Sequence, residues 1–196
     1  MSKADRTRQH IIERTAPLFN TKGYEATSLK DIQDATGLTK GSLYGNFTDK
    51  DEIATQAFKY AINHVKETVR RKLDGVNTYK KQLIALFDFY AEYVFDSPIP
   101  GGCPLLNSAI EVDDYRTSMR RVVVKELMNT VNFIAVIIEK GIESGEFKKG
   151  TKSKELAYTF FCCIEGAIMY SRVERSSEPM DIIIRHCKSI VENISK

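Results

Sequence analysis

The chain has 196 residues, of which 42% are hydrophobic and 28% charged, and its formal net charge is +3 at pH 7. This length fits one domain or two small ones, and the composition excludes an intrinsically disordered chain. The mild positive charge permits a nucleic-acid partner without requiring one. Five prolines and eleven glycines leave little room for turns, so we expect few and long secondary-structure elements.

The sequence shows no targeting or membrane segment. The N-terminus lacks the apolar core of a secretion signal. The most apolar run, residues 156–171, is interrupted by Glu165 and is shorter than the ~20 residues that a membrane span requires. We therefore expect a cytoplasmic protein with no membrane partner.

Cysteine and histidine usage argues against a metal or cofactor site. The three histidines are far apart in sequence and form no metal-ligand motif, so we expect no metal and no cofactor. No pair of cysteines has CxxC spacing, and in a reducing compartment free thiols are expected. The four cysteines are Cys103, Cys162, Cys163 and Cys187.

Hydrophobic residues recur at helical spacing along the whole chain, and no stretch shows the alternation of a β-strand. We therefore predict an all-α fold of about nine helices. A first helix through residues 11–19 should end at Gly23. The other predicted helices cover residues 29–35, 40–46, 49–73 (with Thr48 and Asp51 as a capping box), 78–95, 104–112, a long segment from Asp113 or Asp114 to residue 142, 153–175 and 180–194.

Residues 28–47 read as a helix, a tight turn at residues 36–39 and a second helix. Two short helices joined by a glycine-containing turn are typical of the DNA-binding helix-turn-helix, whose second helix enters the major groove. Hydroxyl residues at both helix starts can cap the helices and help to hold a phosphate. The predicted DNA-contacting residues are Ser28, Thr39, Lys40, Gly41, Ser42, Tyr44, Asn46 and Lys50.

The pattern alone leaves a purely structural helix pair open, because short helices joined by a glycine turn are common. Residues 1–52 carry eight Lys or Arg and eight Asp or Glu, which counts against a strongly electrostatic DNA binder. Residues 37–47, however, contain one lysine and no acidic residue. The local charge therefore permits contact with DNA.

A longer motif makes the interpretation specific. The run Ile11-Ile12…Lys22-Gly23-Tyr24…Thr27-Ser28-Leu29…Gly37-Leu38-Thr39-Lys40-Gly41-Ser42-Leu43-Tyr44…Phe47…Lys50 resembles the N-terminal signature of TetR-family transcriptional repressors. The resemblance covers about the first fifty residues. It implies a DNA-binding domain at residues 1–48, and a helical domain at residues 49–196 that binds an effector and forms a homodimer. It also implies an operator of two-fold symmetry.

One position departs from the family pattern. Gly45 stands where the family usually has a larger residue, often aromatic or basic. Glycine inside a helix costs about 1 kcal/mol, and it cannot read a base with a side chain. The sequence therefore does not predict the operator.

The segment Gly101-Gly102-Cys103-Pro104 resembles the Gly-Cys motif of the NemR-type subset, which includes repressors that sense electrophiles through that cysteine. Because Cys103 precedes a proline, we expect it at a helix N-cap, where the helix dipole favours a thiolate. Such a thiolate is a target for oxidants and electrophiles. The alternative is a buried cysteine in a pocket wall, with the glycines serving only the turn.

The expected effector pocket lies between the long central helices and is mostly apolar, which suits a small apolar or electrophilic molecule. The same aromatic and aliphatic spacing is also typical of a plain core. Besides Cys103, the candidate lining residues are Phe87, Tyr90, Leu106, Ile110, Met128, Val131, Phe160 and Ile164.

The last two helices are expected to form the dimer interface, as the resemblance implies. Small residues would permit close helix approach, and aliphatic residues would supply apolar contact. Glu165 could reach the surface, face a ligand or pair with Arg172, and we favour the pair. The predicted interface residues are Gly166, Ala167 and Ser171, with Ile183, Ile190 and Val191.

The sequence thus predicts a homodimeric repressor of a palindromic operator, released by a small-molecule inducer or by thiol modification at Cys103. An enzyme with Cys103 as nucleophile is a rival interpretation, but no histidine lies near it in sequence to act as a base. An activator, or an interaction module within a larger assembly, is the third.

Overall fold

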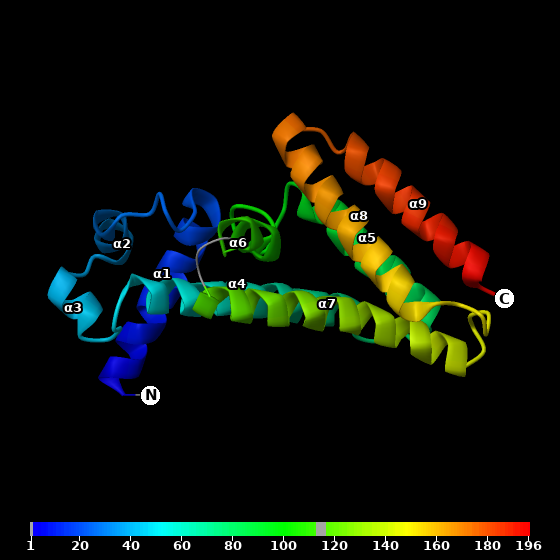
Figure 1. Ribbon diagram of the computed structural model, residues 1–196, viewed down its shortest axis with the longest axis horizontal. Coiled ribbons are helices and arrows are strands. Elements are labelled where there is room, and N and C mark those ends of the chain that lie inside the picture. The colour runs from blue at the N-terminus through cyan, green and yellow to red at the C-terminus, as the bar shows by residue number, and fades with distance from the viewer. Residues whose placement is uncertain (1, 113–116) are drawn as a thin grey trace. The chain divides into compact units, whose positions relative to one another are not determined.

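The computed structural model describes residues 2–112 and 117–196, and its regular elements there are all α-helices. The predicted all-α class is confirmed, and each predicted helix has a counterpart (Figure 1). The predicted start of the seventh helix at Asp113 or Asp114 lies outside the described residues. The helices are α1 (Lys3–Lys22), α2 (Leu29–Thr36), α3 (Lys40–Tyr44), α4 (Lys50–Leu73), α5 (Tyr79–Tyr93), α6 (Pro104–Val112), α7 (Thr117–Glu143), α8 (Ser153–Glu174) and α9 (Glu178–Ile194).

The chain packs as two compact units. The first contains Met1–Lys66 and Pro98–Val124, and the second contains Glu67–Ser97 and Lys125–Lys196. Helices α4 and α7 each run from one unit into the other. This division reflects packing, whereas the functional division at residue 48 stays a prediction. Among the described residues, no helix is both long and apolar enough to cross a membrane.

The first three helices share one small core in the first unit. Its fully buried members come from α1, α2, α3, the segment between α3 and α4, and the start of α4, so burial of these apolar side chains holds the helices together. Each of these side chains is at most 2% exposed. They are Ile11, Ile32, Leu43, Phe47 and Ile53.

Helix α4 begins differently from the prediction. The Asp49 Oδ1 accepts the Glu52 amide at 2.7 Å, so Asp49 caps the helix. The expected cap, Thr48, lies one residue further out and donates its amide to Glu52 Oε2 at 2.8 Å. The predicted Thr48–Asp51 capping box is therefore wrong, because two neighbouring residues could both cap and only one can occupy the position.

Helix α6 is fastened to the C-terminal end of α1 within the first unit. The Asn20 amide donates to the Pro100 carbonyl at 2.8 Å and to the Gly102 carbonyl at 2.9 Å. Asn107 donates in turn to the Asn20 carbonyl at 2.9 Å. Glu111 accepts the backbone N–H of Tyr24 with both carboxylate oxygens, at 2.8 and 2.9 Å. The segment from Pro100 to Glu111, about eighty residues away in sequence, thus holds the C-terminal end of α1 in place.

In the second unit, α8 and α9 run antiparallel beside α5, as Figure 1 shows. The rings of Phe87 on α5 and Phe160 on α8 meet edge to face, with their centroids 5.1 Å apart. Arg175 ends α8 in the left-handed conformation, with φ 58° and ψ 40°. One face of α8 is buried in this unit, and the opposite face is exposed.

Candidate nucleic-acid interface

The turn between α2 and α3 has a fixed geometry. Gly37 ends α2 in the left-handed region (φ 70°, ψ 16°), which glycine adopts without steric cost, and its amide donates to the Gln33 carbonyl at 2.7 Å. The Thr36 hydroxyl donates to the Ile32 carbonyl at 2.7 Å and accepts the Leu38 amide at 3.3 Å. These bonds satisfy the polar groups of the turn and fix how α3 leaves it.

Helix α3 has five residues and presents a polar face. The Thr39 hydroxyl accepts the Ser42 amide at 3.2 Å and caps the helix. Leu43 is fully buried against the core, so the other side of the helix faces outward. Four of the predicted DNA-contacting residues lie exposed on this short segment: Thr39, Lys40, Gly41 and Tyr44.

The end of α3 explains the unusual glycine. Gly45 is the C-cap residue (φ −75°, ψ −16°), so it lies at the helix end and not in its interior, where glycine would be costly. Ser42 and Asn46 are half-buried, and the Asn46 amide donates back to the Ser42 carbonyl at 2.8 Å. These two predicted contact residues therefore also support the helix itself.

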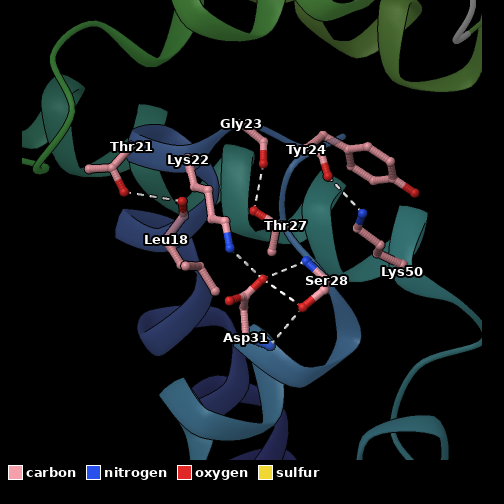
Figure 2. Close-up of polar contacts among 9 residues, drawn as sticks. All are labelled: Leu18, Thr21, Lys22, Gly23, Tyr24, Thr27, Ser28, Asp31 and Lys50. Atoms are coloured by element: carbon pink, nitrogen blue, oxygen red, sulfur yellow. Dashed lines mark hydrogen bonds and ion pairs between the residues drawn. The ribbon is translucent and has the colours of Figure 1, made fainter.

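Ser28, another predicted contact residue, is the N-cap of α2 and is engaged by a neighbouring carboxylate (Figure 2). Its hydroxyl donates to Asp31 Oδ2 at 2.6 Å and accepts the Asp31 amide at 3.1 Å. Lys22 donates to the same carboxylate oxygen at 2.6 Å. The Lys22 ammonium and the two Ser28 donors hold the pKa of Asp31 well below its ordinary value of 3.8.

Lys50, the last predicted contact residue, lies on Tyr24 (Figure 2). Its ammonium donates to the Tyr24 carbonyl at 2.6 Å and lies 4.0 Å from the centre of the Tyr24 ring. The Tyr24 hydroxyl donates to Asp51. Sequence reasoning missed the role of Tyr24, because the side chains of Lys50, Asp51 and Glu111 that bind it are 26, 27 and 87 residues away and no local signal predicts such contacts.

The predicted effector residues are divided between the two units. Cys103, Leu106 and Ile110 belong to the first unit, and the other six belong to the second. The prediction is wrong for Ile110 and Met128, whose side chains are 70% and 55% exposed. These two face outward and do not line an enclosed pocket. Helical spacing identified an apolar stripe but not its direction. The remaining residues are buried or half-buried, namely Cys103, Leu106, Phe87, Tyr90, Val131, Phe160 and Ile164.

A cleft does lie in the first unit, where α1, α4 and α6 meet. None of the predicted effector residues lines it. Glu111, at its edge, is already engaged by the Tyr24 amide. Within residues 2–112 and 117–196, no three His, Cys, Asp or Glu side chains are placed to hold a metal ion.

The predicted interface residues also divide. The prediction is wrong for Ala167, Ser171 and Val191, because they are buried inside their own unit and cannot contact a second copy. Gly166 is exposed, and Ile183 and Ile190 are half-buried. Glu165 is buried too, which excludes a surface position. The Arg172 guanidinium donates to the Val94 carbonyl, and its pairing with Glu165 stays a prediction. Sequence reasoning missed the exposed apolar stripe on the outer face of α8, which consists of Tyr158, Cys162, Met169 and Val173.

A glycine turn between two short helices, with an exposed polar second helix, has the geometry of the helix-turn-helix of DNA-binding proteins. Residues 11–57 match the family model described as bacterial regulatory proteins, tetR family, and residues 80–187 match the tetracycline repressor-like C-terminal domain. The chain belongs to the TetR family of transcriptional regulators, which are not enzymes.

Whole-chain relatives agree with this assignment. A TetR-family regulator from Cytophaga hutchinsonii is 39% identical, with a TM-score of 0.93 over 100% of this chain and 98% of its own. The transcriptional repressor DhaR of Mycobacterium sp. is 23% identical over 96% of each chain. The repressor NemR of Escherichia coli is 21% identical over 94% of each chain.

The Asp31 network predicts a pH-dependent contribution to stability. Asp31→Asn removes the charge that Lys22 and Ser28 stabilise, so we expect a lower urea midpoint than in the wild type at pH 7. A depressed carboxyl pKa stabilises the folded state above the unfolded pKa, and that stabilisation is lost as pH falls through the folded pKa. The difference should therefore shrink progressively below about pH 4.

The control is Asp34→Asn, which neutralises an exposed carboxylate on the same helix. We expect its midpoint to stay within experimental error of the wild type throughout the titration. A difference for Asp31→Asn that is independent of pH would contradict the assigned role of its charge.

Proposed function

We propose that this regulator is a homodimeric repressor that binds an operator of two-fold symmetry and is released by a small apolar or electrophilic molecule. In this proposal residues 1–48 bind DNA, and residues 49–196 bind the effector and the second copy. One observation carries the DNA-binding part: α3 presents Thr39, Lys40 and Tyr44 outward while Leu43 anchors it to the core.

The exposed side chains of α3 suit the major groove. The Thr39 and Tyr44 hydroxyls can donate to and accept from base edges or phosphate oxygens, and Gly41 permits a close approach. Lys40 is a point charge without bidentate geometry, which suits a phosphate oxygen more than a base pair. We therefore assign phosphate contact to Lys40.

The test is selection of binding sites from random duplex DNA by the purified full-length protein. We expect the selected sequences to share a two-fold-symmetric site. Lys40→Ala should weaken binding to all sequences similarly and reduce the slope of log K against log salt by about one. Lys154→Ala, an exposed lysine on α8, is the charge-matched control and should change neither quantity. Selection of no common sequence by the wild type would refute the proposed function.

The exposed stripe on α8 is the surface we assign to the second copy. Its residues are spaced by four, seven and four positions, so they lie on one face of the helix. Gly166 lies on the exposed side between Cys162 and Met169. Apart from its chain neighbours and its own helix backbone, no atom of the described residues lies within 4 Å of the position its side chain would take. A second helix could therefore approach closely there. An isologous contact through this face would match a symmetric operator.

Met169→Glu places a charge in the centre of the proposed interface, where its desolvation would be uncompensated. We expect sedimentation equilibrium to give a monomer under conditions in which the wild type is a dimer. The control is Val136→Glu, which introduces the same charge at an exposed apolar residue of α7. A dimer that survives Met169→Glu would show that the contact lies elsewhere.

The position of Cys103 supports a thiol-based release. It directly precedes α6, and its carbonyl accepts the Asn107 amide at 3.1 Å, as expected of a helix start. The side chain is 6% exposed. Any adduct must therefore displace the surrounding chain, and the same segment carries the carbonyls of Pro100 and Gly102 that bind Asn20 of α1. Modification would thus disturb the C-terminal end of α1, the first helix of the proposed DNA-binding domain.

We expect N-ethylmaleimide to release the selected duplex from the wild type, and Cys103→Ser to keep its DNA affinity and resist release. The control is Cys163→Ser, which removes a half-buried thiol of α8 outside the exposed stripe and should respond like the wild type. Equal release of wild type and Cys103→Ser would exclude Cys103 as the sensor. It would leave a non-covalent inducer as the mode of release.

A further inference from the structure

Arg8 of α1 reaches the junction that follows α3. Its guanidinium donates one hydrogen bond to the main-chain carbonyl of Asn46. A second hydrogen bond goes to Glu52 Oε1 at 2.6 Å, in an ion pair. The guanidinium carbon also lies 4.1 Å from the centre of the Phe47 ring. Three different contacts thus hold one side chain against the segment between α3 and α4.

Glu52 extends this contact to the rest of the junction. Its second carboxylate oxygen accepts the Thr48 amide at 2.8 Å and the Thr48 hydroxyl at 3.1 Å. The hydrogen bonds from Arg8 and Thr48 hold the pKa of Glu52 below its ordinary value, in agreement with an ionised pair. Arg8 and Glu52 therefore fix consecutive residues of the junction, from Asn46 to Thr48.

This junction matters because α3 cannot hold its own direction. A helix of five residues is far below the length at which helices are stable alone. Its C-cap, Gly45, has right-handed backbone angles and lacks the left-handed closure that commonly ends a helix. The carbonyl of Asn46, two residues after the helix, is the point at which Arg8 attaches the end of α3 to α1.

We propose that Arg8 is a positioning residue for sequence-specific DNA recognition: with Glu52 it sets the direction of α3 from behind, and it is not itself a phosphate contact. This inference rests on the proposed function, since it concerns how α3 reads DNA. Two observations support this role. The Arg8 guanidinium already donates hydrogen bonds to the Asn46 carbonyl and the Glu52 carboxylate, and the negative charge of Glu52 neutralises its positive charge.

The experiment compares two duplexes, one selected by the wild-type protein from a random pool and one scrambled version of equal composition. Positioning and phosphate contact predict different results for Arg8→Gln. We expect affinity for the selected duplex to fall about tenfold, because α3 is misdirected. Affinity for the scrambled duplex should stay within about twofold, with the salt slope unchanged, because no phosphate contact is lost.

Glu52→Gln provides the sharper test. Removal of a negative charge would by itself strengthen binding to DNA, whereas loss of the Arg8 pair should weaken binding to the selected duplex. We expect Glu52→Gln to lower that affinity about as much as Arg8→Gln, and the double variant to be no worse than either single variant. Arg8→Lys keeps the charge but lacks the two-pronged geometry, so its loss should be intermediate.

The matched control is Arg14→Gln, an exposed arginine on the same helix, which should leave the affinity ratio of the two duplexes unchanged. Equal losses on both duplexes for Arg8→Gln, with a salt slope reduced by about one, would identify Arg8 as a phosphate contact and overturn the proposal. Unchanged affinity for the selected duplex would overturn it as well. If the wild type selects no sequence, the proposed function itself fails. That failure is distinguishable from the two Arg8→Gln results that would overturn only the role of Arg8.

Discussion

The DNA-binding part of this protein depends on one constraint: its exposed helix is too short to be stable on its own. Five residues form α3, and their direction must come from outside the helix. Burial of Leu43 fixes one side, Gly37 fixes the entry, and the contact between Arg8 and Asn46 fixes the exit. The outward residues therefore inherit their geometry from the small core that α1, α2 and α4 share with α3.

Much of this arrangement could be predicted because its causes are local. Ser28 and Thr39 cap α2 and α3 as their hydroxyls suggest, and Gly37 occupies the left-handed position that a glycine after a helix favours. Helix periodicity located the elements, with errors where two residues compete, as Thr48 and Asp49 do at the start of α4. The exposure of Thr39 and Lys40 on one short segment follows from these local features.

The rest could not be predicted, because its causes are distant in sequence. Periodicity shows that α8 has apolar residues nearly all round, but not that Ala167 faces inward and Met169 outward. Likewise, nothing near Lys50 indicates that it lies on Tyr24, nor anything near Arg8 that it reaches Asn46. Such contacts depend on the angle and the position at which two helices cross, and a single sequence determines neither.

The hydrogen bonds that join residues 100–107 to the end of α1 restrict which substitutions these positions tolerate. Gly101 has φ +106°, and a side-chain carbon there would lie 2.5 Å from the Asn20 carbonyl oxygen. Asn107 donates to the same carbonyl oxygen and to the Asn20 side-chain oxygen. A side chain at position 101 would displace the Asn20 main chain, and a change at Asn20 or Asn107 removes the hydrogen bond between their side chains. About eighty residues separate Asn20 from Gly101 and Asn107, yet a substitution at one position alters what the others tolerate, so we expect epistasis between the end of α1 and the Cys103 segment.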